Sequence, residues 1–193
     1  IRSLAETLND GLIKTEDDRS RYYGYILRES MRLSRLINDL LELSRLQSST
    51  VALEKAPFSL NELLEEVTER MRTAASYSGI SVELNLPDGQ ALTALSNRDR
   101  IEQVLVALID NAIKFASDDG RIIVEARRAE NRSQALITVR NTGHIAQDDL
   151  PHLFERFYKA DAAHSDGGTG LGLAIVQEVL ALLGEQIEAA NDG

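Results

Sequence analysis

The stretch 168-GTGLGL-173 carries three glycines at alternate positions and runs straight into the apolar segment Ala174-Ile175-Val176. Glycines at the start of a helix let backbone N–H groups approach a phosphate, and the helix dipole favours the anion. No Gly-Lys-Ser/Thr follows, so the stretch is not a P-loop. No strand leads directly into it, so it is not a Rossmann fingerprint either. By itself the stretch fits a phosphate-binding loop or a flexible glycine hinge.

Three further short motifs that could bind a ligand lie upstream of this loop in the sequence. The helical hexapeptide 110-DNAIKF-115 offers an amide oxygen for a hard cation at Asn111 and a phosphate-binding cation one turn later at Lys114. The tripeptide 141-NTG-143 follows a predicted strand, and 154-FERFYK-159 is rich in aromatics. Each has an ordinary alternative: a solvated helix side, a strand-ending turn and a short helix that packs its aromatics.

The first quarter of the chain is helical in pattern. Residues 1–8 read as the end of one helix, and residues 17–47 read as a long helix preceded by Thr15 as N-cap. Apolar residues recur at helical spacing on this second helix: Ile26, Leu33, Leu36, Ile37, Leu40, Leu41 and Leu43. A helical hairpin that dimerises into a four-helix bundle would bury such a stripe. Packing of the helix on its own globular domain is the alternative.

Residues 51–58 are expected to form an extended linker, because Pro57 disfavours helix at the residue before it. The remaining pattern predicts helices over 59–76, 97–115 and 170–183, and strands over 80–86, 91–95, 121–127 and 135–140. A polar connection at 130–133 joins the last two strands. Residues 141–168 are rich in loop formers. Helices and strands segregate along the chain, which is typical of an α+β fold.

Composition excludes several classes of protein. The net charge is −10, without the basic footprint of a nucleic-acid binder. There is no cysteine, and therefore no disulfide framework. The sequence contains no run of about 20 apolar residues, the length that a membrane-spanning helix needs. Because the chain starts at Ile1 and the first residues already read as helix, we expect a piece of a longer protein.

Taken in their order and spacing, the segments Asn111–Lys114, Asn141–Gly143, Phe154–Lys159 and Gly168–Gly172 resemble the N, G1, F and G2 boxes of sensor histidine kinases. That family belongs to the wider group of gyrase, Hsp90 and MutL ATPases. The segment 28-RESMRLSRLINDLLELSRLQ-47 is similar to the second hairpin helix of the family.

The resemblance implies a dimerisation and phosphotransfer hairpin over residues 1–50, a linker over 51–57 and a catalytic ATP-binding domain over 58–193. It implies that this domain is a two-layer α/β sandwich with a mixed, mostly antiparallel sheet, whose last strand lies beyond Gly193.

The resemblance also implies roles for single residues. Asn111 would ligate Mg²⁺, Lys114 would contact phosphate, and Asn141 would face adenine. Residues 145–167 would form a mobile lid. The full set of implied nucleotide contacts is Asn111, Lys114, Phe115, Asn141, Gly143, Ile145, Tyr158, Lys159, Gly168, Thr169, Gly170, Leu171, Gly172 and Leu173.

The sequence departs from the family pattern in three ways. Ala107 stands where the family has a first asparagine four residues before Asn111, which reduces the expected ATPase and kinase activity. Asn141 replaces the adenine-facing aspartate. Because an amide could pair with adenine or guanine, we expect looser base selection. The phosphoacceptor histidine is absent, since the three histidines are His144, His152 and His164. We expect it upstream of Ile1, so the chain alone should not autophosphorylate.

The resemblance therefore implies the cytoplasmic core of a sensor histidine kinase that binds Mg-ATP, with a response regulator receiver domain as partner and a parent protein anchored in the cell membrane. Exposed hairpin residues such as Ser34, Arg35 and Asn38 are candidates for regulator choice. A degenerate, non-catalytic nucleotide-binding module is the alternative that Ala107 and Asn141 motivate. A plain ATPase of the gyrase or Hsp90 kind is a third, which the absence of a glutamate at Ala107 disfavours.

Overall fold

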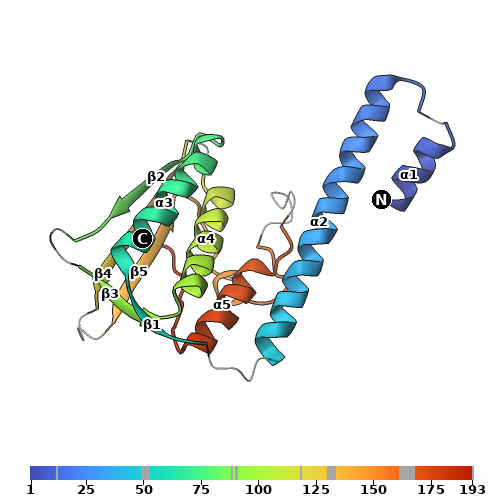
Figure 1. Cartoon of the computed structure of the whole chain (residues 1–193). Coiled ribbons are helices and arrows are strands. Elements are labelled where there is room, and N and C mark those ends of the chain that lie inside the picture. The colour runs from blue at the N-terminus through green and yellow to red at the C-terminus, as the bar shows by residue number, and fades with distance from the viewer. Residues whose placement is uncertain are drawn as a thin grey trace.

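The structure is a computed structural model that describes residues 1–11, 13–48, 53–87, 89, 91–117, 119–129, 134–160 and 168–192. It has the predicted α+β architecture, with helices and strands in separate layers (Figure 1). The helices are α1 (Arg2–Asn9), α2 (Glu16–Ser48), α3 (Leu60–Ser76), α4 (Arg98–Phe115), the 3₁₀ turn η1 (Leu150–His152) and α5 (Gly172–Leu183). The strands are β1 (Ala56–Ser59), β2 (Ser81–Asn85), β3 (Thr93–Ser96), β4 (Arg121–Arg128) and β5 (Ala135–Asn141).

Some expectations fall outside the described residues. These are the end of the hairpin at 49–50, the first part of the linker at 51–52, the connection at 130–133, and the lid segment 161–167 with His164.

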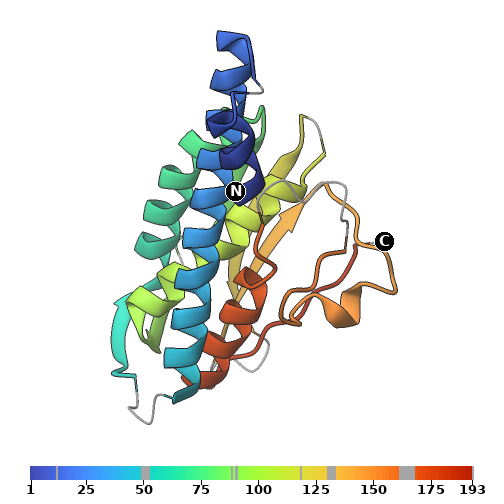
Figure 2. The ribbon, with the colours of Figure 1, turned by 90° about the vertical axis from the view of Figure 1, so that its right-hand side faces the viewer.

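The N-terminal hairpin consists of α1 and the 33-residue α2, which lie side by side (Figures 1 and 2). Thr15 caps α2 as predicted, because its hydroxyl oxygen accepts a hydrogen bond from the Asp18 N–H at 3.2 Å. The Asp18 carboxylate accepts the Thr15 hydroxyl proton in return, at 2.6 Å. No helix within the described residues combines the length and the hydropathy needed to cross a bilayer.

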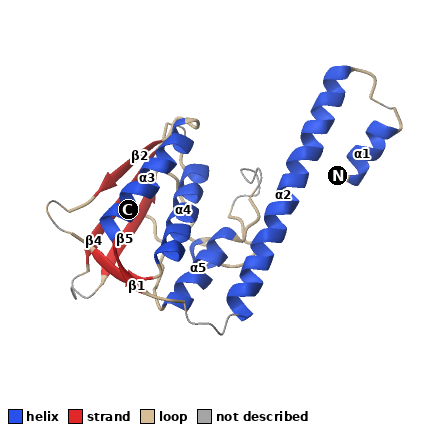
Figure 3. Cartoon of the chain, viewed as in Figure 1, coloured by secondary structure: helices blue, strands red, loops and turns tan. Residues whose placement is uncertain are grey.

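The main sheet is mixed and has the strand order β2-β4-β5 (Figure 3). Strands β2 and β4 run parallel, with Ser81 opposite Arg121, whereas β4 and β5 run antiparallel, with Ile122 opposite Asn141. Strands β1 and β3 form a separate antiparallel pair. The predicted linker over 51–58 is wrong in its last part, because residues 56–59 form a strand. Strand β3 supplies the antiparallel partner, with Ala56 opposite Ser96 and Ser59 opposite Thr93.

Helices α3, α4 and α5 enclose the core. Helix α3 begins after Ser59, which caps it: the Ser59 hydroxyl oxygen accepts a hydrogen bond from the Glu62 N–H at 3.3 Å. Helix α3 packs on β2, α4 packs on β5, and α5 packs on α4. The largest fully buried side chains come from all three helices, from β4 and from Leu171 just before α5: Leu60, Leu63, Leu64, Val67, Leu105, Ile109, Ile122, Val124, Leu171, Val176, Val179 and Leu183.

The apolar stripe of α2 is divided between two environments. Its C-terminal half lies against α5, and Leu43 and Leu46 are each only 4% exposed. Several other large apolar side chains on α2 are exposed: Tyr23, Leu27, Met31, Leu33, Ile37, Leu40 and Leu41. The alternative interpretation, packing on the chain's own globular domain, is therefore confirmed for part of the stripe, and burial of the rest in a dimer stays a prediction. One portion packs on the chain's own globular domain, and the other portion is uncovered.

Thr68 gives a first testable prediction. Its side chain is 1% exposed, and its hydroxyl has no hydrogen-bond partner among the described residues. A buried hydroxyl without a partner keeps its desolvation cost, so Thr68→Val should raise the free energy of unfolding by about 1 kcal/mol. Urea denaturation measures the change. Thr73→Val is the matched control on the exposed side of the same helix and should change stability by less than about 0.5 kcal/mol. Equal effects of the two substitutions would contradict the prediction.

Candidate functional site

The last turns of α4 carry three of the predicted site residues. Helix α4 is fixed at its start by Asn97, whose side-chain oxygen accepts from the Arg100 N–H and whose side-chain nitrogen donates to the Glu54 carbonyl, both at 3.0 Å. Asn111 is half-buried, and its side chain has no hydrogen-bond partner among the described residues. Lys114 is half-exposed and ion-paired with Asp110 one turn earlier.

Ala107 lies one helical turn before Asn111 and packs, partly buried, against the hydrophobic core. Its methyl group offers no oxygen to a cation. Phe115 ends the helix with a 46% exposed side chain. The α4 terminus therefore presents one amide without a partner in the described part of the chain, one paired cation and one exposed aromatic ring.

The end of β5 lies directly against this helix terminus. The Asn141 side-chain nitrogen donates to the Phe115 carbonyl at 3.3 Å. Gly143 comes closer still, because a Cβ atom at that position would lie 2.1 Å from the Phe115 carbonyl oxygen and 2.7 Å from the Asn141 side-chain nitrogen. A further side-chain hydrogen bond joins Ser117 and Thr142 at 2.9 Å. The structure thus brings together two of the four predicted segments.

The other two segments also meet. The Phe157 N–H donates to the Gly170 carbonyl at 2.8 Å. Both residues have positive φ angles, 65° at Phe157 and 74° at Gly170. A Cβ atom on Gly170 would lie 2.9 Å from the Cα and carbonyl carbon of Phe157. Gly168 and Gly172, in contrast, face open space. Of the three glycines in the loop, Gly170 is the one that close backbone packing requires.

Helix α5 begins at Gly172 and not at the predicted Gly170, because the left-handed backbone of Gly170 cannot belong to a right-handed helix. The Leu171 side chain is fully buried in the core, so a ligand could contact this residue only through its backbone. Leu173 is half-buried. The Thr169 hydroxyl oxygen accepts from the Leu171 N–H at 3.3 Å and holds the loop in place.

Tyr158 lies over η1. Its hydroxyl donates to the Asp149 carboxylate at 2.6 Å, and its ring lies 5.4 Å from the ring of His152. The hydrogen bond to Asp149, together with partial desolvation and the nearby negative charges, raises the pKa of Tyr158 above its usual value of 10.0. Tyr158 therefore stays a protonated donor at physiological pH. Lys159 follows it, half-buried.

Ile145 marks the start of the predicted lid. Its backbone N–H donates to the Asn191 side-chain oxygen at 3.2 Å, and its carbonyl accepts from the Asn191 side-chain nitrogen at 2.6 Å. Asp192 pairs with Arg140 at 2.5 Å. The C-terminal segment thus clamps the chain where it leaves β5. The sequence contained no signal for this clamp.

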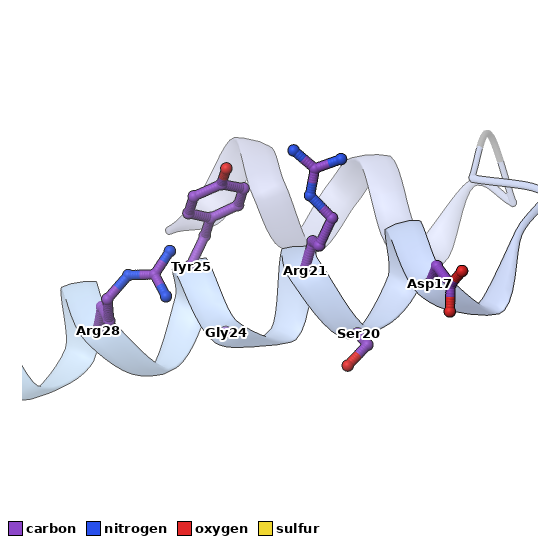
Figure 4. A pocket seen from close by; sticks show the side chains of 6 residues that line it. All are labelled: Asp17, Ser20, Arg21, Gly24, Tyr25 and Arg28. Carbon is purple, nitrogen blue, oxygen red and sulfur yellow. The ribbon is translucent and has the colours of Figure 1, made fainter.

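A hollow elsewhere on the molecule contains none of the predicted site residues. It runs along the first half of α2 (Figure 4) and is lined by Asp17, Ser20, Arg21, Gly24, Tyr25 and Arg28. The Arg28 guanidinium lies 4.8 Å from the centre of the Tyr25 ring. The lining comes from a single helix, so the hollow is separate from the site at the ends of α4 and β5.

Two segments of the chain, one at each end, match known protein families. Residues 96–193 match the family described as histidine kinase-, DNA gyrase B-, and HSP90-like ATPase. Residues 1–49 match the His Kinase A (phospho-acceptor) domain.

Individual relatives agree with these matches. The sensor protein SrrB of Staphylococcus aureus strain MRSA252 is 31% identical over the whole chain, which spans about a third (33%) of the length of that relative. Full-length ShkA, solved in complex with AMPPNP, superposes with a TM-score of 0.72 at 32% identity, over 88% of this chain and 35% of ShkA. The histidine kinase AdeS of Acinetobacter baumannii gives a TM-score of 0.69 at 27% identity, over 94% of this chain and 81% of AdeS. With its helical hairpin, its mixed sheet and its four ordered motifs, the chain belongs to the sensor histidine kinase family.

Proposed function

We propose that this chain is the kinase core of a sensor histidine kinase, which binds Mg-ATP and transfers the γ-phosphoryl group to a histidine outside residues 1–193 and onward to an aspartate of a response regulator. One observation carries the proposal. The Phe115 carbonyl at the end of α4 contacts both Asn141 and Gly143 at the end of β5, so the implied metal-binding and base-binding segments lie at one place. ShkA, the relative solved with AMPPNP, has the same fold.

The orientation of the Asn141 amide supports adenine as the bound base. Its nitrogen donates to the Phe115 carbonyl, so its oxygen is the atom left to accept a hydrogen bond from the amino group of adenine. Two-bond pairing with guanine O6 and N1–H would need the amide reversed, which would break the bond to Phe115 and bring two carbonyl oxygens together. This orientation of the amide therefore favours adenine over that pairing with guanine.

The phosphate groups would lie between α4 and the glycine loop. Asn111 fits a magnesium ligand, because its half-buried amide oxygen is a hard donor without a partner among the described residues. Mg²⁺ would supply charge neutralisation for the triphosphate. Lys114 would exchange its pairing with Asp110 for a phosphate oxygen, and the N–H groups at the start of α5 would face the anion.

The chain's own residues would bind and position ATP, and the acceptor would come from elsewhere. Residues 1–49 match a phospho-acceptor domain and contain no histidine. His144 follows the end of β5 and His152 lies in η1, and we assign neither of them the role of acceptor. Because both kinase segments match their families, the catalytic kinase is favoured over a non-catalytic module.

The partners follow from the same assignment. The exposed apolar side chains of α2 support a homodimer through the hairpin, because association would remove them from water. A receiver domain of a response regulator would dock on the hairpin, with Ser34, Arg35 and Asn38 exposed there. The core would be the cytoplasmic portion of a membrane sensor. The net charge of −10 gives no support to nucleic acid as a partner.

Calorimetric titration with ATP in the presence of Mg²⁺ tests the proposal. Asn111→Ala should weaken binding at least tenfold, or about 1.4 kcal/mol, because it removes the amide oxygen offered to the metal. The weakening should shrink when Mg²⁺ is omitted. Asn85→Ala is the matched control: this asparagine lies on β2 and contacts Glu125 instead. Equal affinities of Asn111→Ala and wild type would contradict the proposed site, as would no binding of ATP at millimolar concentration.

A further inference from the structure

The glycine loop is bonded to the hairpin. The Thr169 hydroxyl donates to the Asp39 carboxylate at 2.7 Å, although the two residues are 130 positions apart in the sequence. Both side chains are half-buried. The contact therefore joins the middle of α2 to a residue between two glycines of the implied phosphate-binding loop.

Asp39 is held in this place by a docked helix face. Leu43 and Leu46, one and two turns further along α2, are buried in the core of the ATP-binding domain. Glu42 lies on the same side, and its carboxylate accepts from Arg100 at 3.1 Å and from Gln103 at 2.6 Å at the start of α4. Residues at these spacings share one side of a helix. The docking of α2 thus includes an apolar contact, an ion pair and a carboxylate at the glycine loop.

That carboxylate conflicts with an anionic ligand in the loop. The Thr169 hydroxyl has one proton, and it cannot donate to Asp39 and to a phosphate oxygen at once. The negative charge of Asp39 also repels phosphate groups, and at a half-buried position this repulsion is less screened than in bulk water. Phosphate groups in the glycine loop would therefore disfavour the Asp39–Thr169 hydrogen bond, and this hydrogen bond would disfavour phosphate groups in the loop.

We propose that Asp39 couples the docking of α2 to the nucleotide site, so that α2 in this docked position weakens binding of ATP and bound ATP weakens the docking of α2. The inference rests on the proposed function, since it concerns regulation of the same site. The two effects must be equal in size, because a coupling free energy between two sites is reciprocal.

Asp39→Asn tests the first half of this coupling in the whole chain. The substitution removes the charge and keeps the side-chain size, so affinity for Mg-ATP should rise about fivefold or more, the lower range of measured couplings. The matched control is Glu29→Gln, which removes one carboxylate from α2 at a place where Glu29 contacts Arg32 of the same helix. Its affinity for Mg-ATP should stay within twofold of wild type.

The outcomes separate the coupling from the function. An unchanged or weaker affinity in Asp39→Asn, with wild type binding ATP, would overturn the coupling and leave the proposed function standing. Equal gains in both variants would also overturn it, because net charge alone would then explain the result. If none of the proteins binds ATP, the proposed function fails and the coupling fails with it.

The second half of the coupling needs a measurement of docking. The chain has no cysteine, so two introduced cysteines can be spin-labelled without side reactions. Arg45→Cys would place one label at an exposed position on α2, and Glu65→Cys would place the other at an exposed position on α3 of the globular domain. Addition of Mg-ATP should shift or broaden the distance distribution between the labels, and Asp39→Asn should produce part of that change without nucleotide. A distribution that neither ATP nor Asp39→Asn alters would overturn the coupling.

Discussion

Replacing Gly143 by alanine should lower the free energy of unfolding by about 3 kcal/mol, the upper end of the usual cost of overpacking. The added methyl group would lie 2.1 Å from the Phe115 carbonyl oxygen, well inside contact distance. That oxygen belongs to the end of α4 and also accepts from Asn141, so it cannot move without disturbing β5. Chemical denaturation measures the loss, and ATP binding should weaken in the same variant because the implied base-binding end of the site would open.

Gly168→Ala is the control for this prediction. A Cβ atom at Gly168 would meet nothing within 4 Å, and the backbone there is not left-handed. The free energy of unfolding should therefore change by less than about 0.5 kcal/mol. If Gly143→Ala proved as mild as Gly168→Ala, the close approach of β5 to the α4 terminus would be wrong.

Gly170→Ala should reduce both stability and nucleotide binding. The residue has a φ of 74°, a conformation that costs an L-residue about 1–2 kcal/mol. The new methyl group would also lie 2.9 Å from the backbone of Phe157. Relief of this clash would move the loop away from residues 154–159, so affinity for Mg-ATP should fall at least tenfold, about 1.4 kcal/mol. Denaturation and calorimetry on the same samples measure the two effects.

Gly172→Ala, two residues further on, should have the opposite effect on stability. Gly172 is the first residue of α5, and a Cβ atom there meets nothing within 4 Å. Alanine is a better helix former than glycine, by up to about 1 kcal/mol. The sign of the stability change thus separates a glycine required by backbone geometry from one that helix formation merely tolerates. Changes in the same direction at Gly170 and Gly172 would contradict the described loop.

Local signals in the sequence predicted most helices. The helical spacing of apolar residues predicted these helices, and Thr15, Ser59 and Asn97 each cap the helix that follows. Strand β2 was predicted by the alternation of apolar and polar residues, because one of its faces is covered. Local reasoning was wrong for β1, because Pro57 reads as linker and its partner Leu95 lies far along the chain.

The same limit applies to the site. Spacing and residue type identified Asn111, Gly143 and Gly170 as site candidates, because such motifs are short and continuous. The bond from Thr169 to Asp39 joins segments 130 residues apart, and no local pattern distinguishes Asp39 from other acidic residues on a solvated helix. Contacts of this kind depend on how α2 docks. They could be found only once the packing of the helix was known.

Helix α2 also acts as a lever. It holds Asp39 about 23 residues from Glu16, which at 1.5 Å per residue is roughly 35 Å of rigid rod. A tilt of only about 3° about the Glu16 end displaces Asp39 by roughly 2 Å, more than a hydrogen bond tolerates. A small tilt at the turn of the hairpin thereby becomes a large displacement at the glycine loop. The displacement per degree of tilt grows with the length of helix between the turn and Asp39.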